Sequence, residues 1–221
     1  MSPIERQNTG AYYPVFLALE GKTCLVVGGG AVAWRKVRAL LECGASVIVV
    51  SPALCPGLKQ MADLQQISAR VKEFAPEDVK DVFLVIAATD KNDVNEQVAR
   101  AARERKIPVN VVDDARLSDF ILPAVLRRGE LTIAISTSGK SPALARKLRD
   151  QLERYLGPEY AALTDLVAEV RSEMKAGGIT VSEESWQKAL DLELLAHLLK
   201  TGERGKAKIL LQMKLSGPVD V

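Results

Sequence analysis

Three consecutive glycines, Gly28 to Gly30, most constrain what this chain can fold into. They directly follow the apolar run 23–27, which is typical of a strand buried on both faces, and they directly precede a segment with apolar residues at helical spacing. Counted from Gly28, the sequence reads G-x-G-x-x-A, with Ala33 in the last position. A strand, a glycine turn and a helix in this order predict a βαβ unit and a parallel sheet.

Each residue type in this turn has a physical reason. Gly28 permits the sharp turn, Gly30 lets a pyrophosphate approach the backbone, and Ala33 allows close packing of helix and strand. The helix start presents unpaired N–H groups and the positive end of its dipole, so Ala31 and Val32 join the predicted site. We therefore predict a bound dinucleotide; the alternative is a tight turn without a ligand.

The next strand, predicted over 46–50, should end beside this turn. It is followed by Ser51, Pro52 and Ala53, and so lacks both the acid that usually binds the ribose and an Arg for a 2′-phosphate. We expect these three residues to line the ribose end through a hydroxyl and backbone groups. The residue pattern leaves NAD and NADP open.

Strand-like and helix-like segments continue to alternate up to about residue 112. Apolar patterns predict helices over 54–67 and around 94–102, and strands over 70–73, 83–87 and 109–112. Such alternation is typical of an α/β fold, here a Rossmann-like doubly wound parallel sheet.

The pattern changes after residue 114. Apolar runs at 124–126 and 131–135 predict a hairpin, and Ser141-Pro142 is a favourable start for a helix with the apolar stripe Leu144, Leu148, Leu152. Further helices are expected over 161–174 and 186–199, separated by Gly177-Gly178, while the order of the last twenty residues stays open. The stripe Trp186, Leu190, Leu194, Leu198 is either a small core or a subunit contact.

These patterns divide the chain into three expected parts. Residues 1–114 form a dinucleotide-binding Rossmann domain, residues 115–152 a small α+β segment, and residues 153–221 a helical C-terminal domain.

Polar residues follow two more of the predicted strands. Ligands collect outside the carboxyl ends of parallel strands, so we expect Thr89 to contact the cofactor. Asp90 is interpreted as the cap of the following helix. Asp113 and Asp114 have no obvious helix to cap, and a carboxylate beside a nicotinamide can take a proton while hydride leaves. At least one of them is therefore a candidate catalytic base.

Five motifs in order carry a family resemblance: the glycine turn with Arg35-Lys36, then 87–90 (AATD), 110–113 (NVVD), 120–124 (FILPA) and 136–142 (STSGKSP). Over about residues 12 to 175 the chain resembles the precorrin-2 dehydrogenase family, the oxidase and ferrochelatase module of siroheme synthases. No methyltransferase module follows, so the stand-alone form is expected.

The resemblance implies NAD-dependent oxidation of precorrin-2 to sirohydrochlorin by a homodimer, with residues 115–152 as the segment for dimerisation and substrate. Some members also insert ferrous iron, as a second substrate, to give siroheme. The family's catalytic aspartate falls on Asp113, whereas members often carry a small residue at Asp114. A serine of some members aligns with Thr137, and Ser136 or Ser138 can replace its hydroxyl.

The implied tetrapyrrole carries many carboxylates, which need cationic or N–H partners. The predicted substrate-binding residues are Thr137, Ser138, Lys140 and Arg116, with Arg127, Arg128 and Arg146 also in the pool of cations. The remaining cations of the first helix, Arg35, Lys36 and Arg38, are interpreted as its solvated face; the alternative places Arg35 or Lys36 near bound anions.

Composition excludes several other classes. A net charge of +2 and 5% aromatic residues argue against nucleic acid, and no apolar run approaches the roughly 20 residues that span a bilayer. Three cysteines without CxxC spacing predict buried free thiols in a reducing cytoplasm, and no residue cluster has the spacing of a permanent metal site. His197 is expected to be structural, and the polar first ten residues a frayed tail. The alternative to an enzyme is a regulatory Rossmann module that senses NAD.

Overall fold

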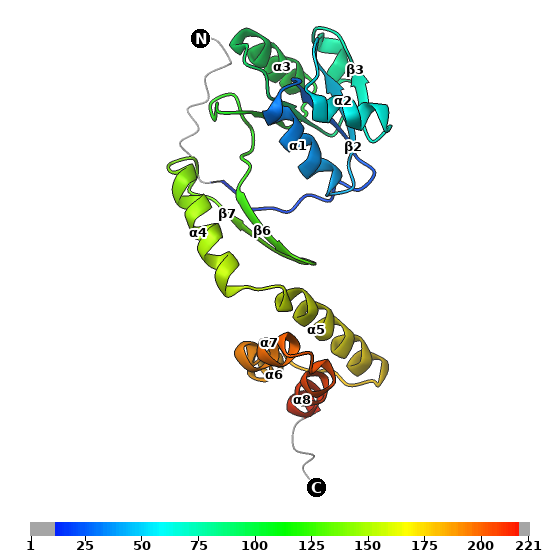
Figure 1. Cartoon of the computed structure of the whole chain (residues 1–221), viewed down its shortest axis with the longest axis vertical. Coiled ribbons are helices and arrows are strands. Elements are labelled where there is room, and N and C mark those ends of the chain that lie inside the picture. Colours follow the sequence, from blue (N-terminus) through cyan, green and yellow to red (C-terminus); the bar gives the residue numbers. More distant parts are fainter. Residues whose placement is uncertain (1–11, 217–221) are drawn as a thin grey trace. The chain divides into compact units, whose positions relative to one another are not determined.

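The computed structural model describes residues 12–216, which form two compact units divided between Leu122 and Pro123. Figure 1 shows the first unit as a sheet flanked by helices and the second as a hairpin followed by helices. The three predicted parts, with boundaries after residues 114 and 152, stay a prediction.

The first unit is built on a parallel sheet of five strands in the order β3-β2-β1-β4-β5. Its strands are β1 (Thr23–Val27), β2 (Ser46–Val50), β3 (Ser68–Arg70), β4 (Leu84–Ala87) and β5 (Val109–Val111). Because β1 pairs in parallel with both β2 and β4, the strand order reverses at β1. Doubly wound sheets bind ligands at such a switch point, outside the carboxyl ends of the strands.

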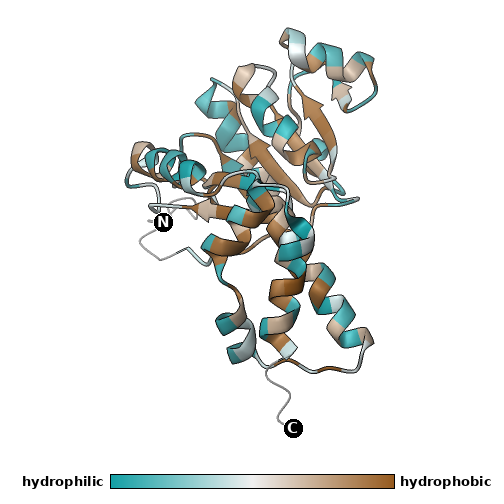
Figure 2. Ribbon diagram, turned by 60° about the horizontal axis from the view of Figure 1, so that its bottom comes forward, coloured by the Kyte–Doolittle hydropathy of each residue, from teal (hydrophilic) through white to brown (hydrophobic). Residues whose placement is uncertain are grey.

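Helices cover both faces of this sheet, and the side chains of each strand alternate between two cores. Val26 contributes to the core under α1 (Ala31–Leu41) and α2 (Pro56–Asp63), while Leu25 and Val27 face α3 (Asn92–Glu104) and the short 3-10 helix η1 (Pro76–Val79). Figure 2 shows these strands as strongly hydrophobic ribbons. The predicted doubly wound α/β fold is confirmed. The sequence signal was the apolar runs, which are typical of strands buried on both faces.

Several predicted boundaries in this unit are wrong, among them the end of the strand expected over 109–112, which stops at Val111. The third strand was expected over 70–73 but ends at Arg70, and the helix expected over 54–67 covers only Pro56–Asp63. Phe83 lies outside β4, with 38% of its surface exposed. Strand ends depend on the neighbouring strand, because each residue needs a backbone partner, and sequence periodicity does not report that partner.

The second unit begins with the predicted hairpin. Its strands β6 (Ala124–Arg128) and β7 (Leu131–Ile135) pair antiparallel with Arg128 opposite Leu131, so the loop is Gly129-Glu130. Helix α4 (Pro142–Tyr155) follows, and the Ser141 hydroxyl accepts a hydrogen bond from the Leu144 amide, as expected for an N-cap.

The rest of this unit is helical: α5 (Glu159–Ala176), α6 (Glu183–Ala189), α7 (Leu192–Lys200) and α8 (Arg204–Ser216). The single helix expected over 186–199 is wrong, because the Asp191 carboxylate caps a new helix by accepting from the Leu194 amide. Trp186, Leu190 and Leu198 pack into the core of these helices, so for them the core alternative holds, whereas Leu194 is 40% exposed.

The frayed tail predicted for the first ten residues lies outside the described residues, as do the last five of the final twenty. Within residues 12–216, no helix combines the length and apolarity required to cross a bilayer.

Candidate active site

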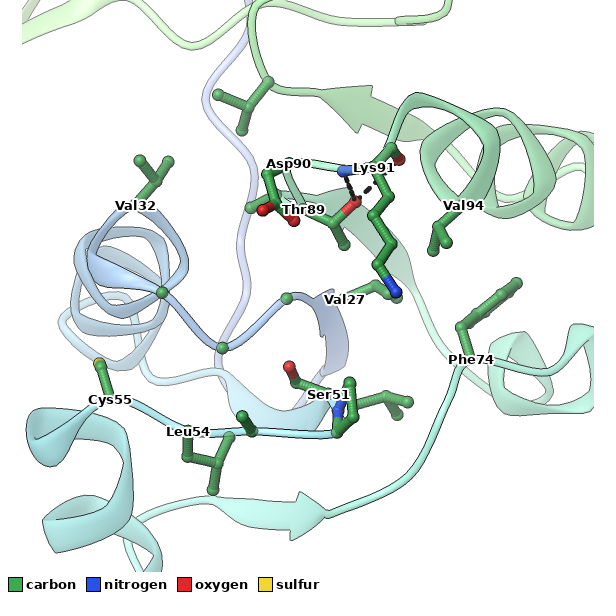
Figure 3. A pocket seen from close by; sticks show the side chains of 18 of the residues that line it. Val27, Val32, Ser51, Leu54, Cys55, Phe74, Thr89, Asp90, Lys91 and Val94 are labelled. Carbon is green, nitrogen blue, oxygen red and sulfur yellow. Dashed lines mark hydrogen bonds between the residues drawn. The ribbon is translucent and has the colours of Figure 1, made fainter.

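A cavity of about 650 Å³ opens at the carboxyl ends of β1, β2 and β4. Asp113 lines this cavity. So do all eight residues predicted to bind the cofactor, which are Gly28, Gly30, Ala31, Val32, Ser51, Pro52, Ala53 and Thr89. Figure 3 shows the glycine turn facing the cavity, with Ser51 below it and Thr89 across from it. Small-molecule sites typically have this size and lie in such a crevice.

The three positions of the glycine turn differ in why they carry a glycine. Gly28 has φ +129°, and a Cβ there would lie 2.4 Å from the Ala88 carbonyl oxygen. A Cβ on Gly29 would lie 1.7 Å from the carbonyl oxygen of Ala53. The chain's own packing therefore requires a glycine at both positions.

Gly30 is the exception. Its φ of −86° is open to any residue, and a Cβ there would meet no protein atom within 4 Å. Gly30 is also the N-cap of α1, whose helix dipole favours an anion at that end. The space in front of Gly30 is therefore open to a phosphate, and the residues present fit a dinucleotide.

The loop after β4 forms the opposite wall of the cavity. The Thr89 hydroxyl donates to the Asn95 side chain at 2.8 Å and accepts from the Lys91 amide at 3.2 Å, which holds the entry to α3. The expectation that Asp90 caps this helix is wrong: the N-cap is Lys91, and it is Thr89 and the buried Asn95 that satisfy the turn. Asp90 instead lines the cavity.

Asp113 follows β5 in a firmly held loop. The Ser118 hydroxyl accepts from the Val111 amide at 2.9 Å and donates to the Asp114 carbonyl oxygen at 2.8 Å, and Ser118 is buried. Asp113 itself has φ +62°, a left-handed conformation that Asp tolerates better than most residues. Within residues 12–216 its carboxylate makes no hydrogen bond, so it is available to a ligand of the cavity.

Its neighbour Asp114 is engaged inside the same loop. The carboxylate accepts from the Arg116 amide at 2.9 Å and pairs with the Arg116 guanidinium at 3.2 Å. Partial burial raises the pKa of Asp114, but the hydrogen bonds from Arg116 outweigh it and hold the pKa below its usual range. Asp114 therefore stabilises the loop. Arg116, which was predicted to bind substrate, forms this ion pair with Asp114.

Among the cations of α1, Lys36 differs from the expectation of a solvated face. It is half-buried, and burial together with the nearby charge of Arg35 lowers the pKa of Lys36, while the charge of Asp113 acts in the opposite direction. Lys36 thus lies within electrostatic range of Asp113. Arg38 is exposed and stacks over the Trp34 ring at 5.4 Å, as a surface residue does.

The remaining predicted substrate residues belong to the second unit, in the loop between β7 and α4. The Thr137 hydroxyl accepts from the Ser141 amide at 3.0 Å, and the Ser136 hydroxyl accepts from the Ser138 amide at 2.9 Å. Ser138 has φ +53°, and Lys140 is exposed. Two of the three candidate hydroxyls therefore hold the shape of this loop.

Comparison with known proteins finds two family models. One, described as Putative NAD(P)-binding, matches residues 15–124, and the other, described as Sirohaem biosynthesis protein central, matches residues 128–155. The solved structure of SirC, precorrin-2 dehydrogenase, matches with a TM-score of 0.69 and 28% identity, covering 93% of this chain and 100% of that one. The chain belongs to the precorrin-2 dehydrogenase and siroheme synthase family.

Curated relatives agree. The siroheme synthase of Nitrosococcus oceani is 40% identical over 208 residues, which cover 93% of this chain and 44% of the relative. Siroheme synthase 3 of Aeromonas hydrophila is 39% identical over 198 residues, which cover 89% and 42%. The chain thus spans less than half the length of these siroheme synthases. Because the family model described as Putative NAD(P)-binding matches its first unit, this chain has a site for a nicotinamide cofactor.

Sequence reasoning missed several residues of this family member's cavity: Gly29, Leu54, Cys55, Glu73, Phe74, Lys91, Val94. Glu73 and Phe74 follow β3, and the position of residues after a strand was the signal that could have found them. This signal was not recognised because the third strand was predicted to continue to residue 73, whereas it ends at Arg70. Gly29 was missed because its constraint comes from Ala53, which is distant in sequence.

The cysteines and the histidine take no part in these contacts, except that Cys55 lines the cavity. None of the three cysteines forms a disulfide, as predicted, but only Cys24 is fully buried. Burial, helped by the nearby Cys43, raises the pKa of Cys24 to about 11. His197 is exposed on α7, and no group of three or more His, Cys, Asp or Glu in the described part of the chain lies close enough to hold a metal ion.

Proposed function

We propose that this protein catalyses the NAD-dependent dehydrogenation of precorrin-2 to sirohydrochlorin in siroheme biosynthesis. The names of its relatives, siroheme synthase and precorrin-2 dehydrogenase, support this assignment. The observation that carries it is local: Asp113 and the phosphate cradle at Gly30 line one cavity.

Each part of the chain has a task in this reaction. When bound, the nicotinamide ring supplies the hydride acceptor. The N–H groups at the start of α1 hold the pyrophosphate, and Ser51, Pro52 and Ala53 lie along the ribose end. The carboxylate of Asp113 accepts the proton that the substrate releases with the hydride, so that one hydride and one proton leave for each double bond formed. Lys36 of α1 lies within electrostatic range of this carboxylate.

The tetrapyrrole carboxylates need cations and N–H groups. We propose Lys140, Thr137 and Ser138 in the loop before α4, and Arg116 after β5, as their partners. A homodimer is part of the same proposal, because Leu144 and Leu148 on α4 are 50% and 39% exposed.

The decisive experiment mixes the folded protein with NAD and precorrin-2 and follows the absorbance of sirohydrochlorin. NAD-dependent turnover is expected, and it should be slower with NADP. A folded protein that binds NAD without turnover would instead be the regulatory NAD-sensing module.

Ferrous iron is the second substrate to test. The same assay, run with and without ferrous iron, reports whether sirohydrochlorin accumulates or is consumed to siroheme. Iron insertion without NAD, starting from sirohydrochlorin, would identify a chelatase activity, for which Asp113 is the available base for pyrrole N–H removal.

A further inference from the structure

The cavity extends beyond the ribose end that the sequence pointed to. Glu73, Phe74, Lys91 and Val94 line it in addition to the glycine turn. In the view of Figure 3, Phe74 and Val94 lie on one side, and the Lys91 side chain reaches toward them from the loop after β4. Two half-buried apolar side chains beside a cation suit a flat base attached to an anionic sugar phosphate.

The segment that carries Glu73 and Phe74 is fixed by one buried carboxylate. Asp78 is 4% exposed, and it accepts hydrogen bonds from the Lys72 ammonium at 2.7 Å and the Ala75 amide at 2.9 Å. The Arg70 guanidinium adds a third at 3.1 Å. Because partners on both sides of Glu73 and Phe74 bind the same carboxylate, this segment keeps its position without belonging to a strand.

Two charges meet at this end of the cavity. The Lys91 ammonium lies 3.9 Å from the Glu73 carboxylate. Alone, Lys91 would attract a 2′-phosphate on the adenosine ribose, as cations do in NADP sites. With Glu73 beside it, that charge is balanced, and an added phosphate would meet a carboxylate.

We propose that Glu73 takes the role of the acid that is absent after β2, so that the cavity prefers a dinucleotide without a 2′-phosphate. In this role Glu73 accepts hydrogen bonds from the ribose hydroxyls and cancels the attraction of Lys91 for a phosphate. It is a specificity residue supplied by the segment after β3 instead of the end of β2. The inference rests on the proposed function, because it assumes that the cavity binds a nicotinamide dinucleotide.

The test compares binding of NADH and NADPH, measured by nucleotide fluorescence without tetrapyrrole. Wild type should bind NADH about tenfold or more tightly than NADPH, since a hydrogen bond to a charged group has about that effect. Glu73→Gln should weaken NADH, strengthen NADPH and change the ratio of the two dissociation constants by about tenfold.

Two further variants make the comparison specific. Glu77→Gln removes the same charge from an exposed residue of η1 that does not line the cavity, and its ratio should stay within about twofold of wild type. Adding Lys91→Met to Glu73→Gln should abolish the gain in NADPH affinity, because the cation that attracts the phosphate is then gone.

The outcomes separate this inference from the proposed function. If wild type binds NADH and Glu73→Gln leaves the ratio of the NADH and NADPH dissociation constants unchanged, the role of Glu73 is overturned and the proposed dehydrogenase function still stands. The same shift in Glu77→Gln also overturns it, since general charge would then be the cause. Wild type that binds neither nucleotide overturns both.

Discussion

The three glycines of the turn show how one residue type can serve different ends. Gly28 and Gly29 are required by atoms of Ala88 and Ala53, so they belong to the fold. Gly30 has an ordinary backbone conformation and open space before it, so neither backbone strain nor packing explains the missing side chain. A glycine that the fold does not need is the best residue-level sign of a binding site here.

Gly30→Asp should therefore separate binding from stability. Asp is a favoured N-cap residue, so the thermal midpoint should not fall, but its charge would face the pyrophosphate. We expect NADH affinity to fall by about tenfold or more, measured by fluorescence titration. Gly29→Ala is the matched contrast, because its Cβ meets the Ala53 carbonyl oxygen and should lower the midpoint. Unchanged NADH binding in Gly30→Asp would contradict the phosphate cradle.

Asp113 and Asp114 are adjacent but differ in what they touch. Asp114 is held by Arg116, whereas Asp113 lines the cavity. Replacing Asp113 by Asn keeps a residue that tolerates the left-handed conformation, whereas Ala would add strain of about 1–2 kcal/mol.

Asp113→Asn should reduce turnover by about 10²- to 10⁴-fold, the usual contribution of a general base. NADH affinity should stay within about twofold, because the carboxylate acts after the cofactor is bound. The measurement is sirohydrochlorin formation beside a nucleotide titration. Retained turnover would refute the assignment of Asp113.

At the scale of elements, the segment between β3 and η1 is the least regular part of the cavity wall. It has few backbone partners of its own, and Asp78 replaces them by binding Arg70, Lys72 and the Ala75 amide. Burial by itself would raise the pKa of Asp78, but Lys72, the Ala75 amide and Arg70 together lower it.

Asp78→Asn should lower the free energy of unfolding by about 1–3 kcal/mol at pH 7, measured by urea denaturation. A lowered pKa means that the carboxylate contributes fully above its unfolded pKa of about 3.9 and loses its contribution as the pH falls through the folded value. The difference between wild type and Asp78→Asn should therefore shrink below about pH 4. A difference that is constant between pH 7 and pH 3 would contradict the charged role of Asp78.

On the scale of the whole molecule, the two units carry different parts of the proposed chemistry. The first contains the nicotinamide site and Asp113, and the second contains the loop of Thr137, Ser138 and Lys140. Helix α4 also exposes the apolar side chains of Leu144 and Leu148, whereas Trp186, Leu190 and Leu198 pack into the core of the C-terminal helices.

If that stripe is the dimer contact, Leu144→Glu with Leu148→Glu should convert a dimer into a monomer. The charges would be costly in an apolar interface but harmless on a solvated helix face. Analytical ultracentrifugation should show the mass falling by half, with circular dichroism unchanged. A wild-type monomer, or a double variant that remains dimeric, would contradict this contact.

Much of the fold was accessible without coordinates, because its signals are local. Apolar runs predict doubly covered strands, glycines mark the turn after β1, and Ser141-Pro142 marks the start of α4, so the parallel sheet, the hairpin and α4 were expected from neighbouring residues alone. The eight predicted cofactor residues and Asp113 share the cavity for the same reason, since strand ends of a parallel sheet meet at one edge.

The tertiary structure decided what depends on contacts between distant residues. It ended β3 at Arg70, broke the helix before Leu192, gave Thr89 and Asn95 the role expected of Asp90, and engaged Asp114 with Arg116. It also brought Glu73 and Phe74 to the cavity through Asp78. Periodicity reports which face of an element is buried, but only packing decides where the element stops and which side chains then meet.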